Sequence, residues 1–312
     1  MPDSTPQSQA SRAPYDRHRN AIRLGPATRP VSYLRSGLVA ASYPLRGIFY
    51  FVRHRYFWPL FWGRLLPLSL ISFLVYFLLF AFAFLPQYAF LAIFHGWGAW
   101  FNAVVLVLGE GLVIIQGLFE GFFVDECRVD AFDATLINYS LTDLIAPHRV
   151  LFLDAPNSVK MLGKPTSPAA YSPWSLVQIA ELIFFLPLNL VPYVGTPAFI
   201  IITGTRLGKL AHYRWFKLRG MDRSARNAEI RSRSWEYAWF GTVAMILELV
   251  PVLSLFFLLT TTTGAAMWVA RMEREAREDV QAQRPGFVTA VVDGGEEGTA
   301  PPPYGQYQDD PV

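Results

Sequence analysis

The feature that most constrains this chain is a run of 45 residues, Leu65 to Gly109, that contains no Asp, Glu, Lys or Arg. As one straight helix it would extend about 68 Å at roughly 1.5 Å per residue, whereas the hydrocarbon core of a bilayer is about 30 Å thick. The run is therefore predicted to enter a membrane and fold back on itself. Pro86 and the triplet Gly96–Gly98 are turn-forming residues, so we expect one helix over about 65–85 and a second over about 98–124.

Two later apolar segments, 175–205 and 237–270, are interrupted by helix-breaking residues. The predicted bends are Pro192, Gly195, Pro197 and Pro251. Because proline removes a backbone hydrogen bond, each segment is predicted to enter the membrane and return, with its bend covered by protein or water. The expected fold class is an all-α integral membrane protein. It has two long transmembrane helices in the hairpin 65–124, two proline-broken re-entrant helical hairpins, and amphipathic interfacial helices.

Basic residues are concentrated in two segments that flank the apolar stretches. Residues 1–64 carry ten Lys and Arg against two acidic residues, and residues 205–238 carry nine against three. Basic flanks stay on the cytosolic side of a membrane, and a full crossing over 175–205 would translocate a segment with a net charge of +6. Both termini are therefore predicted to be cytosolic, as is the glycosylation sequon Asn138-Tyr139-Ser140.

An internal repeat links the two interrupted segments. Leu188–Pro192 matches Leu247–Pro251, and Thr203-Gly204 matches Thr263-Gly264 about a dozen residues later. Repeated broken hydrophobic segments are a feature of transporter-like folds. Chance similarity between two apolar stretches is the alternative explanation.

The two ends of the chain, 1–32 and 274–312, have the polar, Pro- and Gly-rich composition of disordered tails. Near the C-terminal end, Pro301, Pro302 and Tyr304 fit the PPxY pattern that WW domains bind as a preformed polyproline II segment. A WW-domain protein is therefore an expected partner, although so short a motif also arises by chance.

A basic and aromatic segment, 42–59, precedes the first predicted span. Its apolar residues recur with helical spacing and are Leu45, Ile48, Phe49, Val52 and Tyr56. This pattern predicts an interfacial helix that lies among lipid headgroups, where each basic residue contributes roughly 1 kcal/mol on an anionic surface. Arg46, Arg53 and Arg55 are the candidate headgroup contacts, and an anion-binding entrance is the alternative.

Three carboxylates, Glu110, Glu181 and Glu248, lie within apolar stretches. A charged carboxylate at the centre of a membrane helix costs about 2.5 kcal/mol or more, so each is a candidate for an ion or proton pathway. The structural alternative is a protonated or hydrogen-bonded side chain.

The sequence carries no constellation typical of an enzyme. The five His are scattered without metal-ligand spacing, the one cysteine, Cys127, excludes an intrachain disulfide, and no phosphate loop or dinucleotide fingerprint is present. We therefore expect no enzymatic activity, no cofactor and no metal. Membrane lipids are the expected partners, nucleic acid is not, and the oligomeric state is open.

Two signatures resemble those of a known family. The first is Tyr43-Pro44-Leu45-Arg46-Gly47-Ile48-Phe49-Tyr50-Phe51 followed by Trp58, and the second runs from Tyr237-Ala238-Trp239-Phe240-Gly241 through Leu247–Pro251 to Gly264–Trp268. They resemble fungal lipid-droplet and outer-spore-wall membrane proteins, within the wider group of etoposide-induced membrane proteins and CysZ-type sulfate permeases. The Pro192–Gly204 stretch is similar to that group's proline-broken hairpin. The resemblance covers residues 33–273.

The resemblance implies two long spanning helices and two half-penetrating hairpins. For the fungal branch it implies lipid droplets or endoplasmic reticulum and a role in spore-wall or lipid organisation, which is the leading prediction. The physical reason for this prediction is that all sizeable polar segments are expected on one side of the membrane, as a droplet monolayer requires. The alternative is a small-anion, sulfate-like permease or channel using Arg53, Arg55 and Glu110.

Overall fold

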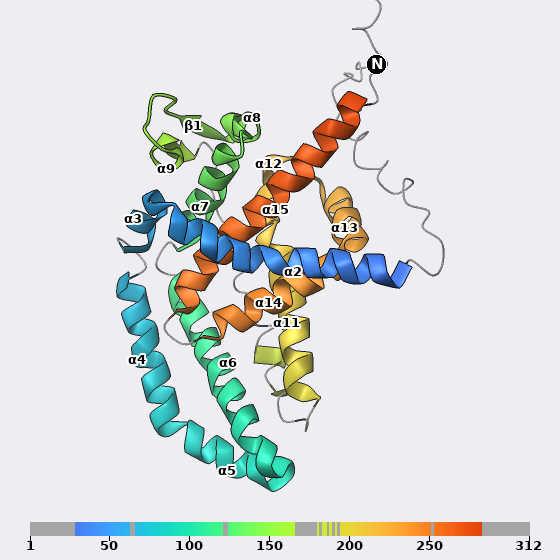
Figure 1. Cartoon of the computed structure of the whole chain (residues 1–312). Coiled ribbons are helices and arrows are strands. Elements are labelled where there is room, and N and C mark those ends of the chain that lie inside the picture. Colours follow the sequence, from blue (N-terminus) through green and yellow to red (C-terminus); the bar gives the residue numbers. More distant parts are fainter. Residues whose placement is uncertain are drawn as a thin grey trace, which may run out of the picture. The chain divides into compact units, whose positions relative to one another are not determined.

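The computed structural model describes residues 29–62, 66–120, 124–165, 194–250 and 253–282, with positions 180, 183–185, 187–188 and 191. This part of the chain is predominantly helical, as expected (Figure 1). A small antiparallel sheet, which the sequence did not predict, pairs β1 (Arg149–Leu151) with β2 (Leu162–Pro165). The chain forms two compact units, residues 20–273 and residues 1–19 with 274–312. The second contributes only residues 274–282 to the description.

The predicted hairpin is present. Its first arm consists of α4 (Leu66–Phe82) and α5 (Phe84–His95), which pack against α6 (Ala99–Glu120) beyond the turn η4 (Gly96–Gly98). Gly96 has a φ of 52°, a conformation that glycine adopts readily. The turn is therefore where the sequence placed it, although the first arm reaches residue 95 rather than 85.

The first arm is bent by 53° between α4 and α5. Pro86 has no N–H to donate to the carbonyl of Phe82, where α4 ends. On either side of the break the backbone bonds continue, from Ala83 N to Leu79 O at 2.8 Å and from Gln87 N to Ala83 O at 3.1 Å. Pro86 therefore bends the arm and does not turn the chain back.

The other helices follow the polar and interrupted segments. They are α2 (Arg29–Arg53), η2 (Arg55–Phe57), α3 (Trp58–Leu60), α7 (Val124–Asn138), α8 (Thr142–Ile145), η5 (Ala146–His148), α9 (Ser158–Met161), α11 (Gly195–Ala211), α12 (Tyr213–Leu218), α13 (Arg223–Ser232), α14 (Ser234–Glu248) and α15 (Ser254–Ala282). Helix α15 continues nine residues past 273 into the segment expected to be disordered, and α2 begins within the expected N-terminal tail.

Two of the described helical stretches, 96–115 and 254–281, are long and apolar enough to cross a membrane. The bent pair α4–α5 would make a third if it forms one span. The segment 237–270 is broken between α14 and α15, near the predicted bend, but Pro251 itself lies outside the described residues, as does Pro192. The re-entrant course of both interrupted segments stays a prediction.

Glycines allow several helices to cross with their backbones in contact. A Cβ on Gly241 of α14 would overlap the carbonyl of Gly204 on α11, and one on Gly204 would come within 2.7 Å of Gly241 O. At a second crossing, a Cβ on Gly264 of α15 would overlap the carbonyl of Tyr43, and one on Gly47 of α2 would lie 2.7 Å from Gly264 N. No larger residue fits at either crossing without separating the helices.

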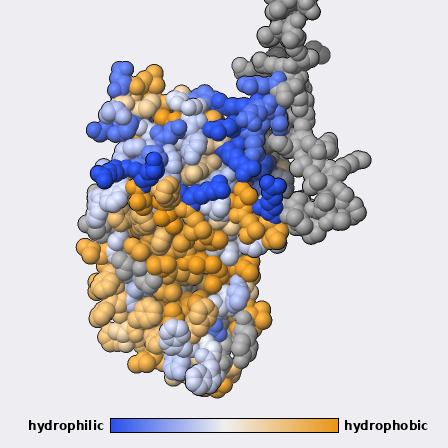
Figure 2. All heavy atoms as spheres, viewed as in Figure 1, coloured by the Kyte–Doolittle hydropathy of each residue, from blue (hydrophilic) through white to orange (hydrophobic). Residues whose placement is uncertain are grey.

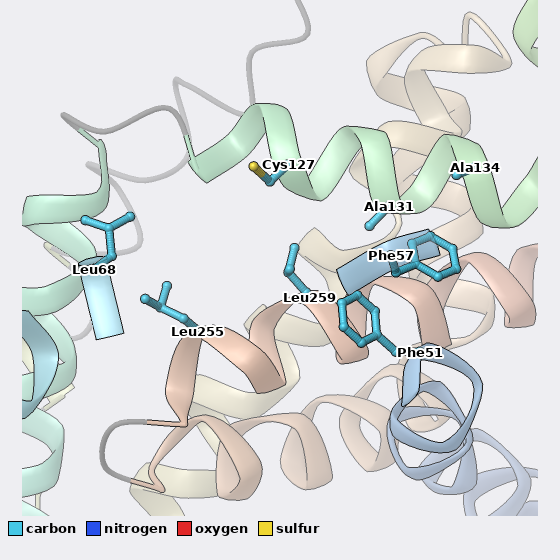
Figure 3. Close-up of a cluster of buried hydrophobic side chains, with 8 residues drawn as sticks. All are labelled: Phe51, Phe57, Leu68, Cys127, Ala131, Ala134, Leu255 and Leu259. Atoms are coloured by element: carbon cyan, nitrogen blue, oxygen red, sulfur yellow. The ribbon is translucent and has the colours of Figure 1, made fainter. Parts of the chain in front are cut away.

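A cluster of buried apolar side chains joins the start of the hairpin to the polar part of residues 20–273 (Figure 3). It consists of Phe51, Phe57, Leu68, Cys127, Ala131, Ala134, Leu255 and Leu259. These residues come from α2, η2, α4, α7 and α15, so the cluster fixes α2 against the root of the hairpin. Apolar side chains also cover the outer surface of α4, α5 and α6 (Figure 2).

Gly241→Ala is expected to lower the stability of the detergent-solubilised protein by about 1–3 kcal/mol, because the added methyl group overpacks the α11–α14 crossing. The midpoint of thermal unfolding measures this loss. Gly98→Ala is the matched control, since a Cβ there has no heavy atom within 4 Å. Equal midpoints for the two variants would contradict the close crossing.

Candidate functional site: a membrane-facing surface and buried polar groups

Helix α2 has one buried face and one exposed apolar face. Small and aromatic residues line the buried face, which packs against α14 and α15: Gly37, Ala40, Tyr43, Gly47 and Phe51. The exposed apolar residues are Leu34, Leu38, Leu45, Phe49 and Val52. They fall on one stripe of the helix, the pattern of a helix that inserts into the headgroup boundary of a membrane.

A basic stripe adjoins the apolar one. Arg35, Arg46 and Arg53 are all exposed, and their spacings of 11 and 7 residues place them on one side of α2. The guanidinium of Arg46 lies 5.4 Å from the ring centre of Tyr43, and Arg55 is exposed just beyond the end of the helix. The predicted contacts Arg46, Arg53 and Arg55 therefore lie together near the C-terminal end of α2.

Exposed tryptophans mark both ends of the hairpin. Trp58 and Trp62 lie before its first helix, and Trp97 and Trp100 lie at its tip, where Trp97 is fully exposed. The 22 residues of α6 extend about 33 Å, close to the roughly 30 Å of a bilayer core. Tryptophan prefers the membrane–water interface, so this spacing suits a hairpin that reaches from one headgroup layer to the other.

Two of the three candidate carboxylates lie among the described residues and have different surroundings. The amide Nε2 of Gln87 on α5 donates to both oxygens of Glu110 at 2.8 Å, which favours the hydrogen-bonded alternative for this residue. Glu248 is 2% exposed at the end of α14, and its Oε1 has no hydrogen-bond partner among the described residues. Glu181 lies outside the described residues.

Two of the predicted bend residues open α11. Gly195 is its first residue, and its backbone N–H donates to Val191 O at 3.1 Å. Pro197 follows in the first turn, where its missing N–H costs nothing. The hydroxyl of Thr196 donates to Asn102 Oδ1 at 2.9 Å, which ties the start of α11 to α6.

A buried ion network, which the sequence did not predict, connects the polar helices of residues 20–273. Asp133 on α7 accepts two hydrogen bonds from Arg214 on α12, at 2.9 and 2.7 Å, and one from Arg149 on β1 at 3.3 Å. Arg149 also donates to Asp130 at 2.6 Å. These ion pairs join α7 to β1 and α12, which gives the network a structural role. The only sequence signal is the pair Asp130 and Asp133, three residues apart on one helix face.

A second buried carboxylate anchors α12 on α15. Glu273 accepts from the indole Nε1 of Trp215 at 2.7 Å and forms an ion pair with Arg219. A buried carboxylate with these partners is satisfied, and it fixes the orientation of α12.

His212 is enclosed by aromatic rings from three helices. Its ring centre lies 4.6 Å from that of Trp268, 5.2 Å from Tyr237 and 5.9 Å from Trp215, and its Nδ1 lies 2.9 Å from the Tyr237 hydroxyl. Burial lowers the pKa of His212 to about 3, and the nearby Arg233 lowers it too. Tyr237 and Trp268 belong to the second family signature, so that signature encodes a packed aromatic box.

The predicted WW-domain ligand adds nothing to this geometry. Pro301, Pro302 and Tyr304 lie outside the described residues. Within the described part of the chain, no group of three His, Cys, Asp or Glu is arranged to hold a metal ion.

Comparison with known proteins gives one weak relative. The chain is 27% identical over 104 residues to the outer spore wall protein LDS1 of Saccharomyces cerevisiae, which covers 32% of each sequence. The chain thus aligns with about a third of that relative's length. No protein-family model matches the chain, and no solved structure matches it. The similarity supports the resemblance to fungal outer-spore-wall proteins, and the wider grouping with CysZ-type permeases finds no support.

The stability of the protein is expected to fall as the pH decreases from about 6.5 toward 3. In this range His212 is neutral in the folded state but binds a proton when the chain unfolds. Its contribution therefore lowers the free energy of unfolding by about 1.4 kcal/mol for each pH unit of acidification. Thermal unfolding of the wild type and of His212→Gln, measured from pH 7.5 to 4.5, isolates this contribution from that of other groups. Identical slopes for the two proteins would contradict it.

Proposed function

We propose that this protein is a non-enzymatic integral membrane protein of the endoplasmic reticulum and lipid droplets that supports spore-wall or lipid organisation. The single observation that carries the proposal is the surface of residues 20–273. Most of its exposed apolar side chains lie on α2 and the hairpin, whereas the buried ion network joins α7, β1 and α12. Such a surface suits insertion from one side of a membrane.

The exposed stripe of α2 supports a position at the cytosolic headgroup level. Its apolar side would contact acyl chains while Arg46 and Arg53 contact anionic headgroups. The hairpin, with its uncharged tip, would cross the bilayer and return. Both termini would then remain cytosolic, in agreement with the positive-inside rule.

The name of the relative supports the spore-wall part of the proposal. LDS1 is an outer spore wall protein, and the similarity covers only a third of either chain. A role for this chain in the outer spore wall is therefore part of the proposal. A role in organising lipid needs no catalytic group, in keeping with a site made of membrane-facing and structural residues.

Fluorescence microscopy of the tagged protein with an endoplasmic-reticulum marker and a droplet dye tests the proposal. We expect a reticular signal that extends to droplet surfaces when neutral lipid accumulates, and a protein that stays in the membrane pellet after carbonate extraction. Confinement to the plasma membrane or mitochondria would contradict it.

Sulfate flux into reconstituted vesicles provides the complementary measurement. We expect none above that of empty vesicles. Flux that is lost in Arg53→Ala and retained in Arg35→Ala, a control on the same helix, would refute the proposed function in favour of the permease alternative.

A further inference from the structure

A group of phenol, amide and imidazole side chains meets where α2, η2 and α7 come together. The amide Nδ2 of Asn138 donates to the hydroxyl oxygen of Tyr50 at 2.8 Å and to that of Tyr56. The ring of His54 lies 4.1 Å from that of Tyr50, and Tyr139 stacks on Tyr50 at 6.0 Å. Asn138 is exposed, so the group is accessible from the surface. We call these five residues the tyrosine cluster.

The tyrosine cluster keeps a hydrogen-bond donor for a ligand. The phenol oxygens of Tyr50 and Tyr56 each accept a hydrogen bond from Asn138. A hydrogen bond between the two phenols would use only one of their two O–H groups, so at least one O–H remains free to donate to a ligand. Burial raises the pKa of Tyr50, which keeps its phenol protonated. His54 Nδ1 lies 2.8 Å from the carbonyl oxygen of Tyr50 and donates to it, which fixes the orientation of the ring.

Three arginines adjoin the tyrosine cluster. Arg46 precedes Tyr50 by four residues and Arg53 follows it by three, which places all three on one face of α2. Arg55 precedes Tyr56 directly. All three arginines are exposed, and none forms an ion pair within the described residues. Within the described part of the chain, this surface therefore presents positive charges that no ion pair neutralises.

The position of the tyrosine cluster favours a ligand held in a membrane. It adjoins the exposed apolar residues Phe49 and Val52 on α2 and the exposed Trp58 beyond it. This step rests on the proposed function, since it takes α2 to lie at the headgroup level. A lipid bound there would keep its acyl chains on the apolar stripe and its headgroup on the donors.

We propose that the tyrosine cluster and Arg46, Arg53 and Arg55 form a binding site for the phosphorylated headgroup of an anionic membrane lipid. Guanidinium groups bind phosphate oxygens through two parallel hydrogen bonds, and a phenol hydroxyl can donate to a further acceptor position. The site is expected to select a phosphate-bearing headgroup over the bulk lipid because it offers hydrogen-bond donors as well as positive charge.

The test is binding of a fluorescent short-chain phosphatidic acid to the purified full-length protein in a neutral detergent. Arg53→Gln is expected to weaken binding at least about fivefold, because a bidentate phosphate contact is lost. Arg35→Gln is the control, since it removes the same charge from the same helix, and it is expected to change the binding affinity less than about twofold. Tyr50→Phe with Tyr56→Phe removes only the two hydroxyls and is expected to weaken binding about threefold without changing the thermal midpoint. Short-chain phosphatidylcholine is expected to compete poorly.

Three results would overturn the proposal. Equal losses for Arg53→Gln and Arg35→Gln would indicate diffuse charge attraction, and unchanged binding in the double Tyr→Phe variant would remove the tyrosine cluster from the site. Competition by inorganic phosphate at the same concentration as the lipid would indicate a site for a free anion. Because the assay uses detergent, it is independent of the organelle, so its failure is distinguishable from failure of the proposed localisation.

Discussion

The contact of helix backbones at glycine is the constraint on which the rest of this structure depends. Gly204 and Gly241 let α11 and α14 touch, and Gly47 and Gly264 do the same for α2 and α15. Close packing of small residues can hold helices together even in lipid, where the hydrophobic effect gives little attraction. The second crossing fixes α2 on α15. It thereby sets which face of α2 is exposed, and the apolar stripe, the arginines and Tyr50 of the tyrosine cluster lie outside the buried face.

The internal repeat acquires a physical meaning from these crossings. Thr203-Gly204 and Thr263-Gly264 lie at similar distances from the starts of α11 and α15, and each glycine lies at a backbone contact. The hydroxyl of Thr263 also donates to Gly47 O at 3.3 Å, across the crossing. A broken apolar segment followed by a helix with a glycine contact thus occurs twice. This shared position favours a true repeat over chance similarity of apolar stretches.

Features set by local chemistry were predictable from the sequence. The uncharged run predicts the hairpin and Gly96–Gly98 its turn. The apolar spacing on 42–59 predicts the exposed Leu45, Phe49 and Val52 of α2, whereas Ile48 and Tyr56 are half-buried. Features set by distant partners were not. Asp133 and Arg214 are 81 residues apart, and no local sequence pattern indicates that they pair. Asn138 fits a glycosylation sequon, and nothing near it in the sequence indicates its hydrogen bond to Tyr50, 88 residues away. By residue type Pro86 predicts a turn, but the hairpin reverses at Gly96, which supplies a positive φ.

The central claim is that the hairpin crosses a bilayer from the cytosolic side, and cysteine labelling tests it most directly. The chain has one cysteine, Cys127, which is buried, so Cys127→Ala provides a background for single-cysteine variants. In sealed microsomes, a membrane-impermeant maleimide is expected to label Arg55→Cys at once and Trp97→Cys only after permeabilisation. Labelling of Trp97→Cys in intact vesicles, or its protection even after permeabilisation, would contradict a hairpin that reaches the far headgroup layer.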